Sequence, residues 1–223
     1  MNTIEIQPPL LISKDPILKK LGGRRQSRIS ARTKSELDRA LDIIHHHAEP
    51  RAIFKILPLK RVNGVIQLND GTRLKSRNLS RILKPCRKIA LFLATIGDGV
   101  DQIIHRVMKK EPHFGLILDA AASVAVESSV GSLADTIEAE IDGDEGTTLR
   151  YSPGYCDWPL KEQLKLFRLL PAEKLDVSLS PELFMQPRKS VSGVIGIGKK
   201  NALKLNGNAC LNCTNVTCKY RRT

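Results

Sequence analysis

The chain has 223 residues, of which 41% are hydrophobic and 26% charged, a composition that excludes an intrinsically disordered protein and is sufficient for a sizeable core. No apolar run approaches the roughly 20 residues of a membrane-spanning helix. The first residues, MNTIEIQPPLLISKD, lack the basic and then apolar regions of a secretory signal, so we expect a cytoplasmic protein.

The formal net charge of +13 is unevenly distributed along the chain. Residues 1–110 carry a net charge of +14, residues 111–149 contain nine acidic side chains and no Lys or Arg, and residues 150–223 carry +8. A nucleic-acid groove usually combines basic with aromatic side chains, and the basic half has only Phe54 and Phe92. We therefore do not expect nucleic acid as a partner. An acidic protein partner and a solvated basic surface explain the charge equally well.

Two helices are predicted before residue 48. The first begins near residue 14 and ends at Gly22-Gly23, and the second follows a basic linker. His45, His46 and His47 lie at the end of the second helix. Consecutive helical residues point about 100° apart, so three in a row cannot converge on one metal ion. We interpret the three histidines as a solvated helix end.

The next part of the chain has the pattern of β-strands. Residues 52–58 are apolar and β-branched, and residues 65–68 are followed by Asn69-Asp70-Gly71, which is a hairpin signal. Residues 89–96 form a continuous apolar run, which predicts a buried central strand.

The longest predicted helix covers residues 116–141 and follows a shorter one over roughly 98–110. It is rich in Ala, Ser and Gly, whose small side chains let a neighbouring backbone or a ligand approach closely. A polar line runs along this helix, because residues four positions apart lie on the same face. It consists of Asp119, Ser123, Glu127, Gly131 and Asp135. Glu127 has no Lys or Arg nearby in the sequence. It is either a buried carboxylate that needs partners or part of a face wetted by solvent.

The remaining pattern completes the fold prediction. After an acidic loop at 142–146, we expect a helix over 160–170 and two β-like segments at 174–179 and 190–197. The strands alternate too irregularly with helices for a series of βαβ units, so we expect an α+β fold with a mainly antiparallel sheet. The chain divides into an N-terminal helical segment at 1–48, a core at 49–205 and a Cys-rich tail at 206–223.

One loop, RYSPGYCDWP at residues 150–159, concentrates two of the three Tyr and the only Trp. Arg150 offers a planar fork of donors for a carboxylate or phosphate, and Pro153-Gly154 permits a tight turn. Tyr155 and Trp158 offer flat faces for a ring or a sulfonium cation. A ligand with anionic, aromatic and cationic parts, such as S-adenosylmethionine, would suit this loop. The alternative is a well-packed loop that caps the helix at 160.

Two separated motifs resemble the reactivation domain of cobalamin-dependent methionine synthase. That family shows Arg-x-x-Pro-Gly-Tyr, then a helix, then Met-x-Pro-x-x-Ser-Val-Ser-Gly. The matching residues here are Arg150, Pro153, Gly154, Tyr155, Met185, Pro187, Ser190, Val191, Ser192 and Gly193. LATIGDGVDQ, LILDAAASVAVESS and DPILKKLG are also similar to free-standing members of the family, so the resemblance covers nearly the whole chain.

The resemblance implies a twisted, mainly antiparallel sheet with long flanking helices that binds S-adenosylmethionine without a Rossmann core. It implies that Arg150 holds the methionine carboxylate, that Pro153, Gly154 and Tyr155 shape the pocket, and that Glu127 contacts the ligand. It assigns the S-adenosylmethionine site to the core at 49–205. No catalytic general base is expected, since a reduced cobalt supplies the nucleophile and the protein supplies positioning.

The function that the resemblance implies is the reductive reactivation of a cobalamin-dependent methyltransferase, with methionine synthase of methionine biosynthesis as the first choice. S-adenosylmethionine would donate the methyl group, cobalamin would arrive on the partner protein, and a flavodoxin-like or ferredoxin-like protein would donate an electron. The reaction would run in trans, with the basic half docking an acidic partner. The alternatives are a non-catalytic scaffold and an activator of another corrinoid methyltransferase of one-carbon metabolism.

Three cysteines near the end, Cys210, Cys213 and Cys218, have the spacing C-x2-C-x4-C. Such clustering in a cytoplasmic chain favours metal or redox chemistry over structural disulfides. Zinc and iron–sulfur sites normally take four ligands, and Cys86 or Cys156 could supply the fourth. Free thiols are the alternative.

Overall fold

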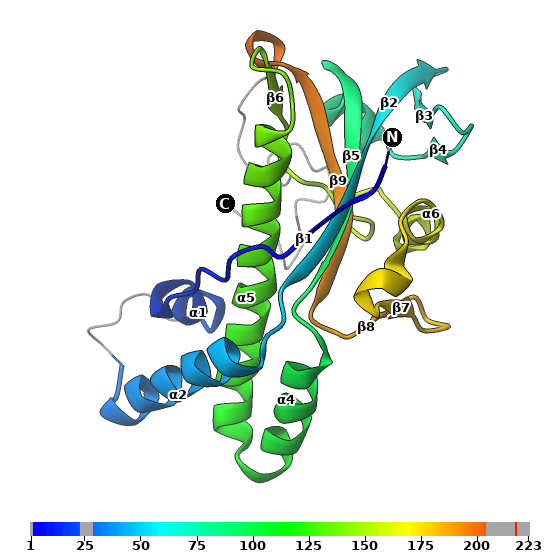
Figure 1. The fold of residues 1–223 in the computed structure, drawn as a ribbon. Helices are drawn as coiled ribbons and strands as arrows, with labels where there is room; N and C mark the ends of the chain where they lie inside the picture. Colours follow the sequence, from blue (N-terminus) through cyan, green and yellow to red (C-terminus); the bar gives the residue numbers. More distant parts are fainter. Residues whose placement is uncertain (1, 23–28, 204–216, 218–223) are drawn as a thin grey trace.

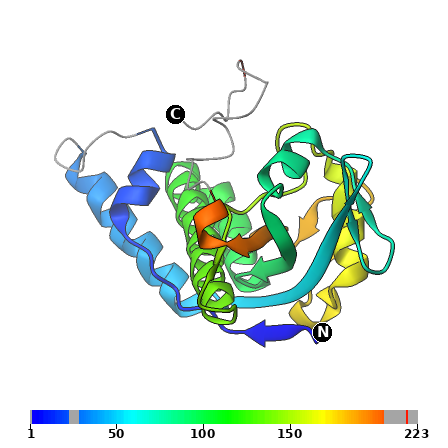
Figure 2. The ribbon, with the colours of Figure 1, turned by 90° about the horizontal axis from the view of Figure 1, so that it is seen from above.

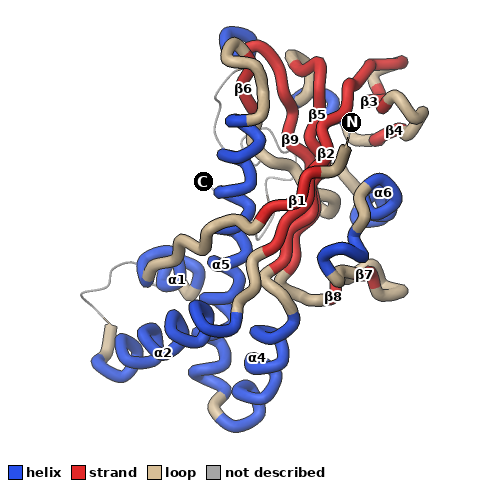
Figure 3. The backbone as a smooth tube through the Cα atoms, in the orientation of Figure 1, coloured by secondary structure: helices blue, strands red, loops and turns tan. Residues whose placement is uncertain are grey.

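The structure is a computed structural model that describes residues 2–22, 29–203 and 217. A twisted sheet with helices on both sides forms its centre (Figures 1 and 3). The main sheet has the strand order β4-β3-β2-β5-β9-β6, with β1 also paired to β2, and every pair is antiparallel. Its strands are β1 (Ile4–Ile6), β2 (Arg51–Val62), β3 (Val65–Leu68), β4 (Arg73–Leu74), β5 (Cys86–Thr95), β6 (Glu145–Thr147) and β9 (Ser190–Lys199). The predicted α+β class is confirmed.

The other described elements are mainly helices. They are α1 (Lys14–Lys20), α2 (Ala31–His47), α3 (Arg77–Ile82), α4 (Asp98–Lys110), α5 (Pro112–Ala139) and α6 (Gln163–Leu169). Short 3-10 turns are η2 (Leu160–Glu162), η3 (Ala172–Leu175) and η4 (Lys200–Ala202), and a small hairpin consists of β7 (Ser178–Leu179) and β8 (Met185–Gln186). The three histidines that end α2 are exposed, as predicted.

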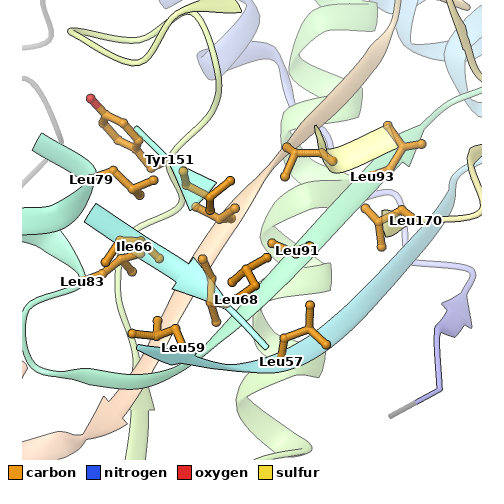
Figure 4. Packing of buried hydrophobic residues seen from close by; sticks show 14 of the residues in the cluster. Leu57, Leu59, Ile66, Leu68, Leu79, Leu83, Leu91, Leu93, Tyr151 and Leu170 are labelled. Carbon is orange, nitrogen blue, oxygen red and sulfur yellow. The ribbon is translucent and has the colours of Figure 1, made fainter. Parts of the chain in front are cut away.

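The central strands are buried on both faces because alternate side chains enter two different cores. On β5, Leu91 and Leu93 pack with α6 residues such as Leu166, in the cluster shown in Figure 4. Ala90 and Phe92 point the other way and pack with α5. Figure 2 shows the resulting layers, with α5 and α6 on opposite sides of the sheet.

The C-terminal half of the long helix α5 covers one face of the sheet, and its N-terminal half continues beside α4 (Figure 1). Its small residues, including the fully buried Ala121, Ala122 and Ala125, allow α2 and α4 to pack against it as well. By length and composition α5 could cross a membrane, although polar residues interrupt its apolar sequence, and 56% of its most apolar window is buried inside the protein. A buried helix in the core of a protein can have the same length and apolar composition as a membrane span. Here α5 packs against the sheet and against α2 and α4.

Local turn signals account for the hairpins. The predicted hairpin at Asn69-Asp70-Gly71 joins β3 to β4, and Asp70 accepts hydrogen bonds from the amide and hydroxyl of Thr72. Asn63 and Gly64, both with positive φ, form a second two-residue turn between β2 and β3. This turn was not predicted, although Asn-Gly is a strong hairpin signal.

Two predicted details are wrong. The strand predicted at 174–179 is restricted to Ser178–Leu179, because η3 occupies its start and Asp176 adopts a left-handed conformation that ends the turn. The helix predicted from residue 160 begins as the 3-10 turn η2. The N-terminal segment also contributes an unpredicted strand, β1, whose three residues pair with β2.

We predict that Gly198→Ala destabilises the fold by about 1–3 kcal/mol, the usual range for overpacking. A Cβ at this position would lie 2.7 Å from the carbonyl oxygen of Pro85 and 3.1 Å from Cα of Cys86, both of which are backbone atoms. The free energy of unfolding in urea measures the effect.

The matched control is Gly131→Ala in α5, where a Cβ would meet no atom within 4 Å. Alanine there should raise the free energy of unfolding by about 0.5–1 kcal/mol, because it favours the helix over the unfolded chain. Equal effects of the two substitutions would show that close packing of β9 against the start of β5 does not limit stability.

Candidate functional site

The two sequence motifs lie side by side at one edge of the sheet. Tyr151 forms an isolated bridge with Val194 of β9: its amide donates to the Val194 carbonyl at 2.9 Å, and the Val194 amide donates back at 2.8 Å. The Arg-x-x-Pro-Gly-Tyr loop is thereby paired to the strand of the Ser-Val-Ser-Gly run. Two motifs that are distant in the sequence thus form one local structure.

Neighbouring residues of the loop point to opposite sides of the sheet because they flank this bridge. The side chain of Tyr151 enters the core that contains α6. Arg150 points to the α5 side and donates to the Glu127 carboxylate. Ser152 also faces that side, since a Cβ on Gly193 would lie 2.9 Å from the Ser152 hydroxyl oxygen and 2.8 Å from the Phe92 ring. Glycine at 193 therefore makes room for the loop.

The ion pair between Arg150 and Glu127 joins the loop to the middle of α5. Both side chains are about one-third exposed, at 32% and 33%. Glu127 is therefore a partly buried carboxylate, intermediate between the buried carboxylate and the solvent-wetted face that the sequence left open. Its partner, Arg150, lies 23 residues later in the chain. Among the described residues Glu127 is the acceptor for Arg150, which leaves other guanidinium N–H groups available to a ligand.

The polar line on α5 meets a second cation near its start. Lys189, which precedes β9, donates to the Asp119 carboxylate at 2.7 Å and to the Ser123 hydroxyl at 3.0 Å. The amide of Arg188 donates to Asp101 of α4 at 2.5 Å. The segment before β9 is thus fixed to α4 and α5 on the same side of the sheet as Arg150.

The aromatic residues of the loop divide between core and surface. Tyr151 and Trp158 are each only 1% exposed and stack with ring centroids 5.8 Å apart. Burial raises the pKa of Tyr151 above its ordinary range. The Trp158 indole N–H donates to Glu162. Trp158 therefore cannot cover a ligand, and that part of the hypothesis is wrong: its burial matches the alternative of a packed loop.

Tyr155 is the aromatic side chain of the loop that reaches solvent, with 49% of its surface exposed. Its ring meets the edge of the Tyr151 ring at a centroid distance of 6.5 Å, and its carbonyl accepts from the Tyr151 hydroxyl at 3.2 Å. Gly154, with φ of 91°, makes the turn that presents it, and Pro153 is buried beneath. The predicted site residues Pro153, Gly154 and Tyr155 thus form a turn held from below by the core.

Asp157 anchors the other end of the loop to α3. Its carboxylate accepts from the Ser76 hydroxyl at 2.7 Å and from the amide of Arg77 at 2.6 Å. Burial acts to raise the pKa of Asp157, but these hydrogen bonds outweigh it and the pKa is lowered. Asp157 was not predicted as a supporting residue, because α3 lies about 80 residues earlier in the chain and no local pattern links the two.

Comparisons with known proteins agree with the motifs. A family model described as "Vitamin B12 dependent methionine synthase, activation domain" matches residues 132–203. The resemblance predicted from the motifs is confirmed. No curated protein matches the chain.

The fold is similar to that of a solved structure described as "Crystal Structure of the MetH Reactivation Domain bound to AdoHcy". The likeness has a TM-score of 0.62 at 15% sequence identity and covers 93% of this chain and 80% of that chain. At this identity it shows a shared fold. The match to the activation-domain model includes Arg150, Pro153, Gly154 and Tyr155, whereas Glu127 lies before the matched span and is brought to it by the fold.

In the part of the chain that the structure describes, no three His, Cys, Asp or Glu side chains cluster in a way that could hold a metal ion. Cys210, Cys213 and Cys218 lie outside the described residues. Of the two candidate fourth ligands, Cys156 is exposed in the loop, and Cys86 is buried beneath β9. Burial raises the pKa of Cys86 to about 11, which disfavours the thiolate that a metal requires.

We predict that Asp157→Ala lowers the free energy of unfolding by about 1 kcal/mol at pH 7, as for the loss of a helix cap. The pKa of Asp157 is lower in the folded protein, so its stabilisation is present above the unfolded pKa of about 3.9 and is lost as pH falls through the folded pKa. The difference between wild type and variant should therefore shrink between about pH 5 and pH 2.

Urea unfolding at several pH values measures this difference, with Asp144→Ala, in the exposed acidic loop, as the control carboxylate. A gap between wild type and Asp157→Ala that stays constant over this pH range would show that the carboxylate charge does not hold the loop to α3.

Proposed function

We propose that this protein reactivates a cobalamin-dependent methionine synthase, using S-adenosylmethionine as the methyl donor. The observation that carries the proposal is the pairing of the Arg-x-x-Pro-Gly-Tyr loop with the Ser-Val-Ser-Gly strand, inside the span that matches the activation-domain family. A domain of the same fold has been solved with AdoHcy bound, the molecule that remains when S-adenosylmethionine loses its methyl group.

Within the proposal, Arg150 binds the carboxylate of the ligand. Arginine has five N–H donors, so it can keep its bond to Glu127 and still receive a second carboxylate. The exposed face of Tyr155 is suited to a flat or cationic part of the ligand, and Gly154 lets the backbone approach it. Pro153, Tyr151 and Trp158 keep the turn in place from the core side.

The chemistry asked of the protein is positioning. The bond between the sulfonium and its methyl group breaks, a bond between that methyl and the reduced cobalt forms, and S-adenosylhomocysteine leaves. One electron from a flavodoxin-like or ferredoxin-like donor first reduces the cobalt. No proton is transferred, so a general base is not required. In this proposal the corrinoid arrives on a partner and the reaction runs in trans. The 223 residues themselves contain no Asp-x-His-x-x-Gly, the usual cobalamin-holding signature.

We predict that Arg150→Ala weakens the binding of S-adenosylmethionine by about 1.5–3 kcal/mol, the scale of a hydrogen bond to a charged group. Calorimetric titration of the purified protein measures the dissociation constant. Arg39→Ala is the control, since Arg39 also pairs with a carboxylate, that of Glu111 at 2.7 Å, on a part of the surface formed by α2 and the start of α5. The control should bind like the wild type.

The same titration separates the proposal from a scaffold function. A wild-type protein that binds no S-adenosylmethionine, alone or with a cobalamin-loaded methionine synthase present, contradicts the proposed methyl-donor role. Equal losses in Arg150→Ala and Arg39→Ala would contradict the assignment of the carboxylate to Arg150.

A further inference from the structure

The segment that follows the loop has an exposed face of unusual composition. The 3-10 turn η2 continues directly into α6, and the exposed positions of the two elements alternate with buried ones. The exposed positions are Leu160, Lys161, Leu164 and Arg168, whereas Glu162, Gln163 and Leu166 are buried and Lys165 is partly buried. The exposed fractions of Leu160 and Leu164 are 37% and 40%.

This face is continuous with the turn at Gly154 and Tyr155. A Cβ on Gly154 would lie 3.6 Å from Cδ1 of Leu160, which places the leucine in contact with the turn. Tyr155, Leu160 and Leu164 therefore extend the loop surface as an apolar strip onto the helix. Large apolar side chains in a contiguous exposed strip are typical of an interaction site.

The strip has cations along its border, and the exposed carboxylate of the same segment, Asp157, is bound by the Ser76 hydroxyl and the Arg77 amide. Arg168 and Lys161 are exposed on the same segment, and a cavity of about 330 Å³ is lined by Gly71, Thr72, Arg73, Lys165 and Arg168. The one acidic residue of η2 and α6, Glu162, is turned inward and bonded to Lys165 at 2.5 Å and to the amide of Lys75 at 3.1 Å. The border therefore favours a partner surface that carries carboxylates.

We propose that this face, defined by Tyr155, Leu160 and Leu164 with Lys161, Arg168 and Arg73 at its border, docks the corrinoid-bearing protein. The partner surface would have apolar side chains at its centre and carboxylates at its rim. This inference rests on the proposed function. Methyl transfer requires the reacting atoms to come within about 3–3.5 Å of each other, so the protein that carries the cobalt must cover the turn that holds the methyl donor.

The apolar and the charged residues of this face are expected to contribute differently to binding. Apolar groups at the centre of an interface supply most of the affinity, while charges at the rim mainly raise the association rate. Substitution of Leu164 should thus act mainly on dissociation, and substitution of Arg168 mainly on association. An electron donor does not need to cover the turn, because electron transfer, unlike methyl transfer, does not require the reacting atoms to be in contact.

The test uses the full chain and, as probe, a cobalamin-loaded methionine synthase fragment that lacks its own reactivation region. We expect Leu164→Glu to weaken binding of this probe at least tenfold and Arg168→Glu to slow association several-fold. Both variants should bind S-adenosylmethionine within twofold of the wild type. Controls are Leu116→Glu, an exposed leucine near the start of α5, and Lys109→Glu on α4, neither of which should alter probe binding.

The outcomes separate this inference from the function on which it rests. Probe binding that is unchanged in Leu164→Glu and Arg168→Glu, or absent in the wild type, overturns the docking face whatever the S-adenosylmethionine titration shows. Loss of binding to a flavodoxin with retention of the probe would assign the face to the electron donor and overturn the inference too. Failure of the wild type to bind S-adenosylmethionine overturns the proposed function, while a probe that still binds through α6 supports the docking face alone.

Discussion

The pair of backbone hydrogen bonds between Tyr151 and Val194 is the constraint on which the candidate site depends. It fixes the loop to the edge of β9 and, through the alternation of side chains, decides which side of the sheet each neighbour faces. Arg150 and Ser152 are directed to α5, and Tyr151 is directed to the core of α6. Glycine at 193 is needed for the same reason, since a side chain there would occupy the space of Ser152 and Phe92.

The loop is held from three directions, which leaves one turn exposed on a rigid base. The Tyr151–Trp158 stack anchors it in the core, Asp157 ties it to α3, and the ion pair with Glu127 ties it to α5. A site whose supporting residues are fixed in this way loses little conformational entropy when a ligand binds. The concentration of aromatic residues in the loop thus serves mainly to build its support, with Tyr155 as the exposed exception.

Features that depend on local sequence could be predicted, and those that depend on distant pairing could not. The sequence predicted the helix α4 and the hairpin at residues 69–71, because the residues that specify each of them are close together in the chain. The partner of Glu127 and the burial of Trp158 follow from the pairing of the loop with β9, which no periodicity reveals. The two motifs indicated the family, but their proximity in space had to come from the structure.

The order of the strands has a consequence for synthesis of the chain. β5 pairs with β2 on one side, and the strand that pairs with its other edge, β9, follows roughly 100 residues later. At about 5–20 residues per second, that apolar edge stays open on the ribosome for roughly 5–20 s. An open apolar edge is a template for wrong pairing, and α5 covers a face of β5 without closing its edge. Chains interrupted between β5 and β9 would therefore be the forms of this protein most prone to aggregate and most dependent on chaperones.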